Sequence, residues 1–235
     1  MKVSIYFLNK ELVLTNDKEC CNKCDKIIAI HKQHSFSSIY NYLKEWMTTK
    51  QHNVWCLYFE NDFIFHSFLS IYLPHYFEIL YAAGGVIFNP QKQAYLFIYK
   101  RGKWDLPKGK IDAAKQRGLF PIYLQDNLTE EKNNIDEQPE ITAIRECIEE
   151  TGISNINIKE NIGITYHLFE QKKQMILKIT QWYLMETSYS DNLTPQVEEG
   201  IEKVEWLSKS DIKEKLIPQT YPSIVELLKR INIIK

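Results

Sequence analysis

The 235-residue sequence lacks any long uncharged apolar run, and this absence sets the first limits on its class. No segment reaches the roughly 18–20 apolar residues that a transmembrane helix requires. The chain begins with a short apolar run, but charges return at Lys10 and Glu11, and no small-residue cleavage site follows. The run is too short for the core of a secretory signal peptide, so a cytoplasmic location is expected.

The sequence also lacks an excess of charge of either sign. Its 29 Lys and Arg residues nearly balance 30 Asp and Glu residues, which leaves a formal net charge of −1 at pH 7. The hydrophobic share of 44% and the charged share of 25% are those of an ordinary globular protein. These values favour neither a nucleic acid polymer nor a membrane as partner, so any nucleotide specificity must come from a local site.

The chain lacks the even number of cysteines that a disulfide framework would need. Of its five cysteines, Cys20, Cys21 and Cys24 are close together in the sequence. A closed zinc site needs four ligands, and the nearest additional candidates are His31 and His34. In a reducing compartment the cysteines would remain thiols, which is the favoured interpretation, with structural zinc as the alternative.

Residues 1–78 have the pattern of a small α+β module in which we expect no catalytic residue. Strands are predicted at 3–8 and 11–15, joined by a turn, and a third strand at 53–58. Apolar residues spaced by three and four predict a helix at 35–47, and the aromatic-rich residues 63–79 are also compatible with helix. The module could cover the site or form a contact in a homodimer.

Residues 79–235 are predicted to form a second domain with an α/β fold. Extended runs occur at 82–89, 94–101, 155–158, 163–168, 174–185 and 203–206. A helix is predicted at Pro139–Thr151, with proline in its first turn and Gly152 just past its end, and another at 221–231. Strands on both sides of a central helix indicate a mixed sheet covered on two faces, an α/β/α sandwich.

The predicted central helix carries three glutamates at positions i, i+3 and i+4, which places them on one face. Like charges within one turn repel one another, and a bound cation would relieve that repulsion. Mg²⁺ suits carboxylate oxygens and keeps waters that phosphate oxygens can replace. The alternative is a solvated helix face paired with lysines. The glutamates are Glu146, Glu149 and Glu150, and the expected apolar side consists of Ala143, Ile144, Cys147 and Ile148.

The same segment resembles the signature of a known family. The run RECIEETGI at residues 145–153 is similar to the second half of the Nudix box, REUxEExGU, in which U is a bulky aliphatic residue. Cys147 is a mild departure at one U position. Glu137 lies eight residues before Arg145, and the run WDLPKGKID at residues 104–112 resembles the loop that opens the box. The resemblance therefore implies the Nudix fold and pyrophosphate hydrolysis for about residues 80–235.

One departure from the family pattern is an insertion inside the box. The pattern puts its first glutamate six residues after the glycine, where this chain has Lys115, and the matching Glu137 comes 22 residues later. Loop closure entropy grows only logarithmically with length, so residues 115–136 can be inserted without a shift of the helix. We expect an excursion that leaves Gly109 adjacent to the helix.

The resemblance implies roles for individual residues. The helix glutamates would bind Mg²⁺ or Mn²⁺, one of them acting as base toward water, and the carbonyl of Gly109 would be a further ligand. Arg145 and Glu137 would pair to structure the site, since a guanidinium prefers a bidentate carboxylate. The implied metal ligands are Gly109, Glu146, Glu149 and Glu150.

The substrate class implied by the resemblance is a nucleoside diphosphate linked to another moiety. Arg101 and Lys108 are candidates for phosphate contact, with surface solubility as the alternative. Glu199 lies in a late loop where some family members keep an extra catalytic glutamate. The competing function is a catalytically inactive ligand sensor or regulator; such proteins usually lose carboxylates from the box, and this chain keeps them.

Overall fold

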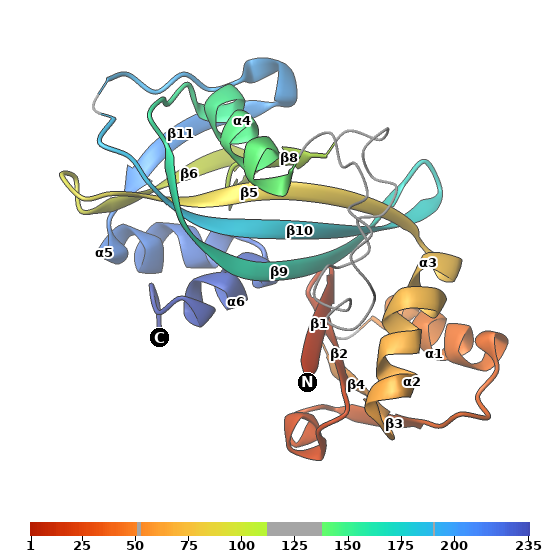
Figure 1. The fold of residues 1–235 in the computed structure, drawn as a ribbon. Helices are drawn as coiled ribbons and strands as arrows, with labels where there is room; N and C mark the ends of the chain where they lie inside the picture. Colours follow the sequence, from red (N-terminus) through yellow and green to blue (C-terminus); the bar gives the residue numbers. More distant parts are fainter. Residues whose placement is uncertain (51–52, 112–137, 190) are drawn as a thin grey trace. The chain divides into compact units, whose positions relative to one another are not determined.

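The computed structural model describes residues 1–50, 53–111, 138–189 and 191–235 (Figure 1). The described chain forms two compact units, one of Met1–Leu80 with Tyr166–Lys178 and one of the remaining described residues. None of the helices in these ranges has the length and apolar character to cross a membrane. The predicted domain boundary between residues 78 and 79 stays a prediction.

The first unit begins with an antiparallel hairpin of β1 (Lys2–Phe7) and β2 (Lys10–Thr15), as predicted. Strand β4 (Val54–Phe59) adds to β2 in parallel, which confirms the strand predicted at 53–58. Strand β3 (Lys26–Ile30), which was not predicted, pairs with β4 in parallel. The strands of the first unit are therefore joined by both parallel and antiparallel pairing.

Helix α1 (Phe36–Thr48) confirms the helix predicted at 35–47. The side chain of Ser35 caps its first turn by accepting a hydrogen bond from the amide of Ser38. At its other end the buried Lys10 donates to the carbonyls of Trp46 and Met47, at 3.1 and 2.5 Å. Carbonyls at a helix C-terminus favour a cation, so this lysine ties the hairpin to the helix although burial lowers its pKa.

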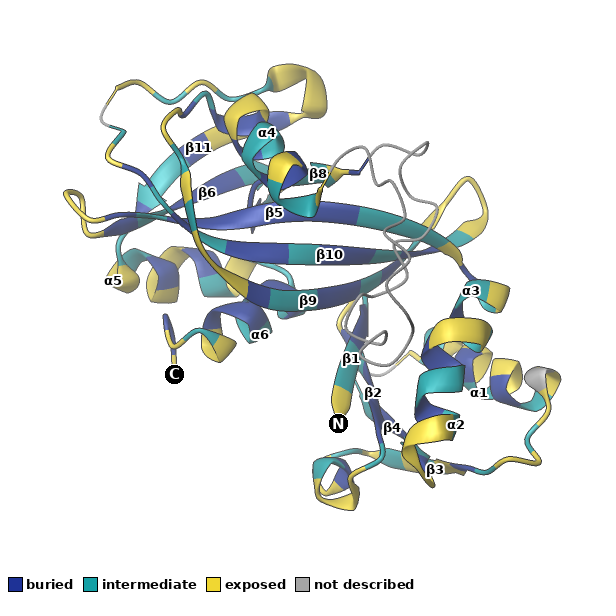
Figure 2. Ribbon diagram, in the orientation of Figure 1, coloured by how far each residue is buried: buried dark blue, intermediate teal, exposed yellow. Residues whose placement is uncertain are grey.

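The aromatic-rich segment is helical up to residue 76. It runs through α2 (Asp62–Ser67), the π-helical turn η2 (Phe68–Tyr72) and α3 (Leu73–Tyr76). A short 3₁₀ turn, η1 (Lys18–Cys21), follows the hairpin. Figure 2 shows that α2 turns one side inward and exposes the other.

All five cysteines are free. Cys21 and Cys56 are buried together with Val13, and Cys24 packs against them. Within the described ranges, no three His, Cys, Asp or Glu side chains are grouped to hold a metal ion. The sequence pattern missed Cys56 as a neighbour of the other thiols, because the parallel pairing of β2 with β4 brings it there.

The sheet of the second unit has strands in the order β11-β6-β5-β10-β9, with β7 paired to β6 and β8 paired to β5, and the adjoining ends of β9 and β10 at Tyr166–Lys178 belong to the first unit. The strand bounds are β5 (Glu78–Asn89), β6 (Ala94–Lys100), β7 (Lys103–Asp105), β8 (Lys108–Lys110), β9 (Asn157–Gln171), β10 (Gln174–Glu186) and β11 (Ile201–Leu207). The strands predicted at 155–158 and 163–168 both belong to the one continuous strand β9. This strand passes through Gly163, which has a φ of 94°.

Alternating side chains of these strands build two cores, one on each face of the sheet. On β10, Trp182 belongs to one core and Tyr183 to the other. Helix α4 (Pro139–Thr151) covers one face, and α6 (Pro222–Arg230) covers the opposite face (Figure 1). The predicted α/β/α sandwich with mixed strand pairing is confirmed.

The segment before α6 contains turns that the sequence pattern did not predict. They are α5 (Lys209–Asp211), the π-helical η6 (Ile212–Leu216) and the 3₁₀ turn η7 (Ile217–Gln219), with η5 (Val197–Glu199) preceding β11. Ile212 and Leu216 extend the core that α6 covers.

Candidate active site

Helix α4 carries the predicted glutamates, and local signals fix both of its ends. Pro139 occupies the first turn, where a missing amide hydrogen costs nothing. Gly152 ends the helix with φ 73°, and its amide donates to the carbonyl of Ile148 at 2.8 Å. A side chain at Gly152 would also collide with Thr194, so this position requires glycine. The helix bounds predicted from the sequence are confirmed.

The face that α4 turns to the sheet is the predicted one at Ala143, Ile144 and Cys147 but not at Ile148. Ala143, Cys147 and Glu150 are buried, at spacings of four and three, whereas Ile148 is 40% exposed. The expectation that Ile148 packs on the sheet is therefore wrong, because a helix turns 100° per residue and the buried stripe runs through Cys147 instead. Glu150 shares that stripe, and the carboxylates thus occupy different environments.

Glu150 is the most deeply buried of the three glutamates, with 4% of its surface exposed. Its Oε2 accepts a hydrogen bond from the backbone amide of Lys108 at 2.8 Å. Burial raises its pKa to about 7, against the opposing effect of the positive charge of Lys108. A carboxyl group in such surroundings is suited to exchange protons near neutral pH.

Glu146 lies against the backbone of Gly109. A methyl group built on Gly109 would overlap the Glu146 carboxyl group, so only glycine leaves room for it. Burial raises the pKa of Glu146, the neighbouring Arg145 opposes this rise, and the charges of Glu149 and Glu199 add to it. The predicted adjacency of Gly109 and the helix is confirmed, since β8 and α4 are in contact.

Arg145 joins two of the glutamates. Its Nη1 donates to Glu146 Oε1 at 2.8 Å and to Glu149 Oε2 at 3.0 Å, and its Nη2 reaches the carbonyl of Lys110 at 3.4 Å. The side chain of Glu149 is 45% exposed, so this carboxylate faces solvent. The predicted partner Glu137 and the insertion at 115–136 lie outside the described residues.

The candidate phosphate contacts surround the loop before β8. Lys108 Nζ binds Asp105 Oδ2 at 2.5 Å, and the nearby carboxylates raise the pKa of this half-buried lysine despite its desolvation. Lys100 Nζ lies 3.3 Å from Glu199 Oε2. The amide of Arg101 donates to Glu202 Oε1 at 3.2 Å. The ammonium group of Lys108 is thus already paired with a carboxylate of the protein.

Asp105 was missed as a part of this site. It is buried, and its Oδ1 accepts from the amide of Leu106 at 2.8 Å while its Oδ2 holds Lys108. Its place in the run WDLPKG was visible, but its pairing depends on the short strand β7, which sequence periodicity does not reveal. Lys108 thus connects the loop to the helix, with its ammonium group on Asp105 and its backbone amide on Glu150.

The donors at this site fit a hard divalent cation that keeps part of its hydration shell. Glu146 and Glu149 already share one positive group, the Arg145 guanidinium, and the Glu146 carboxyl group lies directly against the Gly109 backbone. Mg²⁺ typically takes one or two carboxylates and several waters. In the part of the chain that the structure describes, no three His, Cys, Asp or Glu side chains are grouped to hold a metal ion, and one oxygen of Glu150, Oε2, accepts from the Lys108 amide.

Comparison with known families adds an independent finding. A family model described as the NUDIX domain matches residues 79–228. No curated protein sequence matches the chain.

Several solved structures are similar in part to this chain. A *Caenorhabditis elegans* Ap4A hydrolase binary complex shares 20% identity over 65% of this chain and 95% of its own, with a TM-score of 0.45. The MutT protein from *Methanosarcina mazei* Go1 shares 16% identity over 66% and 94%, also with a TM-score of 0.45. The NUDIX domain of *Shewanella oneidensis* NrtR, complexed with ADP ribose, shares 19% over 71% and 95%, with a TM-score of 0.43. Because these values are low, the family assignment rests on the family model.

Proposed function

Since the chain belongs to the Nudix family and is a pyrophosphohydrolase, we propose that it cleaves the pyrophosphate bond of a nucleoside diphosphate linked to another moiety, with Mg²⁺ or Mn²⁺ as cofactor. The substrate is a small molecule rather than a nucleic acid polymer, and the enzyme acts in the cytoplasm. The proposal extends the family assignment to a substrate class, a metal and named residues.

One observation carries this proposal. The backbone of Lys108 and Gly109 lies against Glu150 and Glu146, although the described chain is interrupted between Ile111 and Gln138. Both halves of the motif are therefore side by side, as a single site requires. A chain that kept the motif without a function would have no reason to place a glycine against the half-buried carboxyl group of Glu146.

The proposed ligands of the cation are Glu146, Glu149, Glu150 and the carbonyl of Gly109. When bound, Mg²⁺ would neutralise charge on the phosphate oxygens and lower the pKa of a water molecule. Glu150, in its buried position, is the proposed base that takes the proton of the attacking water. Glu149 is exposed enough to meet a ligand that arrives from solvent.

Arg145 is proposed as a positioning residue. It holds Glu146 and Glu149 together and contacts the carbonyl of Lys110, so it links the helix to the loop. Its proposed partner Glu137 would add a second anchor. Arg101, Lys108 and Glu199 are proposed substrate contacts. Lys108 is paired with Asp105, and the charge of Glu199 acts on Glu146.

The test is a phosphate-release screen over nucleotide substrates in the presence and absence of Mg²⁺ or Mn²⁺. We expect turnover of a nucleoside diphosphate derivative that stops when the metal is chelated. A screen in which such compounds bind but none is cleaved, with either metal present, would favour a ligand sensor and contradict the proposal.

A glycine variant sharpens this test. Gly109→Ala should remove activity because its methyl group would displace Glu146, while the negative-φ backbone at this position tolerates alanine. Retained circular dichroism with lost turnover is the expected result. Full activity of Gly109→Ala would refute the proposed contact between the loop and the helix.

A further inference from the structure

The first unit contains a cavity of about 320 Å³ that has no part in the proposed hydrolysis. Its lining comes from the end of β3, from α1, from the end of β4 and from the helical segment α2–η2, all within Met1–Leu80. The volume lies at the lower end of the range for small-molecule sites. It corresponds to about ten water molecules at their volume in the liquid, hence to a ligand of about ten non-hydrogen atoms.

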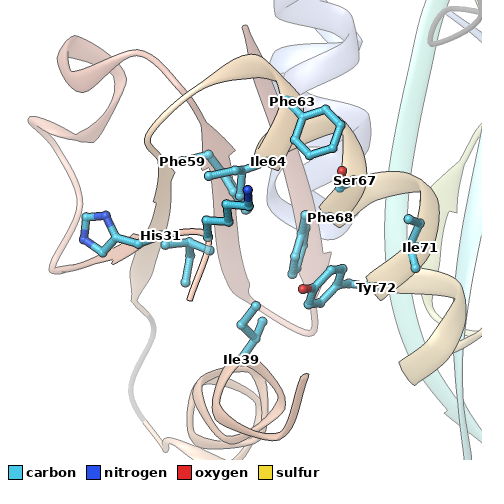
Figure 3. Close-up of a pocket in the computed structure, with 11 residues that line it drawn as sticks. His31, Ile39, Phe59, Phe63, Ile64, Ser67, Phe68, Ile71 and Tyr72 are labelled. Atoms are coloured by element: carbon cyan, nitrogen blue, oxygen red, sulfur yellow. The ribbon is translucent and has the colours of Figure 1, made fainter. Parts of the chain in front are cut away.

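The walls of the cavity are apolar. Ile39, Phe59 and Phe68 are almost fully buried, and the rings of Phe59 and Phe68 lie 5.1 Å apart. Figure 3 shows the rings of Phe68 and Tyr72 on one side of the space and Ile39 on another. An apolar cavity of this kind favours a hydrocarbon or aromatic body over water.

Large apolar side chains also remain exposed where the cavity opens. Phe63 is 75% exposed and Ile71 is 56% exposed, and both belong to the lining. Scattered apolar residues on a surface need no explanation, but an apolar rim around an apolar cavity is typical of a ligand site. Such a rim lets an apolar molecule pass from solvent into the cavity without crossing a polar barrier.

The helical segment that lines the cavity has an uncommon backbone. Phe68, Ile71 and Tyr72 all belong to the π-helical turn η2. π-Helical turns are rare and occur frequently at functional sites, since they cost backbone energy that an ordinary helix would avoid. Here the turn supplies three of the side chains that line the cavity.

Among the described residues, the lining of the cavity contains one lysine, Lys32, and no carboxylate. Lys32 belongs to the lining, is exposed, and makes no hydrogen bond or ion pair within the described part of the chain. His31 binds Glu60 at 3.3 Å, and Figure 3 shows its ring turned away from the cavity. Asp62, at the start of α2, is hydrogen-bonded to Asn16. Lys32 is thus the charged group left to meet a ligand.

We propose that this cavity binds a small apolar carboxylate, with its hydrocarbon or aromatic body against the accessible lining side chains Phe63, Ile71 and Tyr72 and its carboxylate at Lys32. The ligand site is separate from the helix glutamates. If the cavity binds no such ligand, the hydrolase assignment is unchanged, because none of the residues that line the cavity belongs to the candidate active site.

The test uses octanoate, which has ten non-hydrogen atoms, in isothermal titration calorimetry with the full chain. We expect one octanoate per chain and weaker binding of octylamine, whose ammonium group Lys32 repels. Lys32→Gln should weaken octanoate binding by up to about fivefold, the scale of an exposed ion pair, and leave octanol binding unchanged. Added salt should weaken the binding of octanoate but not of octanol.

A matched pair of variants locates the site. Ser67 belongs to the lining and is half-buried, so Ser67→Trp should fill the cavity and weaken octanoate and octanol binding at least about tenfold. Ser70, one helical turn further, is exposed and outside the lining, so Ser70→Trp should bind like the wild type. Circular dichroism checks folding, and Ser67→Phe replaces Ser67→Trp if the larger side chain disturbs the helix.

Three results would overturn this proposal. They are no binding of octanoate to the wild type, unchanged binding in a folded Ser67 variant, and octylamine binding as tight as octanoate binding.

Discussion

Helices α4 and α6 cover opposite faces of one sheet, yet they bury different kinds of side chain. Helix α6 buries Ile224, Leu227 and Leu228 in its core. Helix α4 buries small or polar residues, among them Ala143, Cys147 and Glu150. Burial of leucine removes apolar surface from water and contributes about 1.5–3 kcal/mol per side chain, whereas burial of a carboxylate costs free energy.

The difference between the helices separates stability from chemistry. Apolar burial on the α6 face can offset the free-energy cost, on the α4 face, of burying one glutamate and of clustering three carboxylates. Figure 2 shows that both helices are buried on the side toward the sheet and exposed on the other, so they differ in which side chains they bury rather than in how they are placed. If the comparison is right, substitutions on α4 should change activity more than stability, and substitutions on α6 the reverse.

The largest expected effect is on turnover. Glu149→Gln or Glu150→Gln should lower kcat by about a hundredfold or more, the scale on which single electrostatic contacts act in catalysis. The fold should survive, because each change removes one of several neighbouring like charges. Turnover is measured with the substrate identified by the screen and saturating Mg²⁺.

Glu226→Gln on α6 is the matched control for this prediction. Glu226 pairs with Arg230 on the helix surface, so its replacement should leave kcat unchanged. Wild-type turnover in either α4 variant would contradict the roles proposed for these carboxylates.

The opposite result is expected for the apolar residues of α6. Leu228→Ala should lower the free energy of unfolding by about 2–5 kcal/mol, because it removes a fully buried side chain and leaves a cavity. Ile148→Ala on α4 should cost less than about 1 kcal/mol, since that side chain is 40% exposed. Urea unfolding measures the free energy of unfolding of both variants. An equal decrease for Leu228→Ala and Ile148→Ala would contradict the proposed difference between α6 and α4.

A smaller effect is expected for the positioning residue. Arg145→Ala should lower kcat by about 10–100-fold, as is usual when a group that orients a ligand is lost. Arg145→Lys should recover only a part, because an ammonium group cannot reach Glu146 and Glu149 as the guanidinium does. The metal concentration required for half-maximal activity should rise in both variants, a change that a purely structural role would not produce.

The sequence predicted the elements that carry local signals. Pro139 and Gly152 mark the ends of α4 within the sequence itself, and the apolar spacing of Ile39, Leu43 and Trp46 marks α1. The three-residue strands β7 and β8 and the π-helical turns have no periodicity long enough to detect.

The sequence predicted a part of the candidate site's composition, without Asp105, and, beyond the adjacency of Gly109 and the helix, none of its contacts. The family motif identified the glutamates and Gly109. The hydrogen bond from the Lys108 amide to Glu150 and the pair of Lys108 with Asp105 depend on how β8 pairs with β5 and α4 packs on the sheet. The error at Ile148 has the same origin. The positions of the three glutamates do not show which of the remaining side chains of α4 face the sheet, because that depends on how the helix packs on it.

The smallest expected effect concerns the start of the helical segment on the α6 face. Asp211 and Ser208 form a capping box, and Asp211 Oδ1 lies 2.7 Å from Lys215 Nζ. The hydrogen bond to Lys215, followed by those to Ser208, lowers the pKa of Asp211 to about 2 from its ordinary value of 3.8. The folded state therefore holds this proton less readily than the unfolded state does.

It follows that the stabilisation by Asp211 is present above about pH 4 and is lost as the pH falls toward 2. Asp211→Asn should lower the urea midpoint at pH 7, and the difference from the wild type should shrink between pH 4 and the lowest pH at which the protein stays folded. The difference should also be smaller in a Lys215→Met background, because Lys215 contributes most to the shift. A difference that stays constant from pH 7 to pH 3 would show that the cap acts through its shape rather than through its charge.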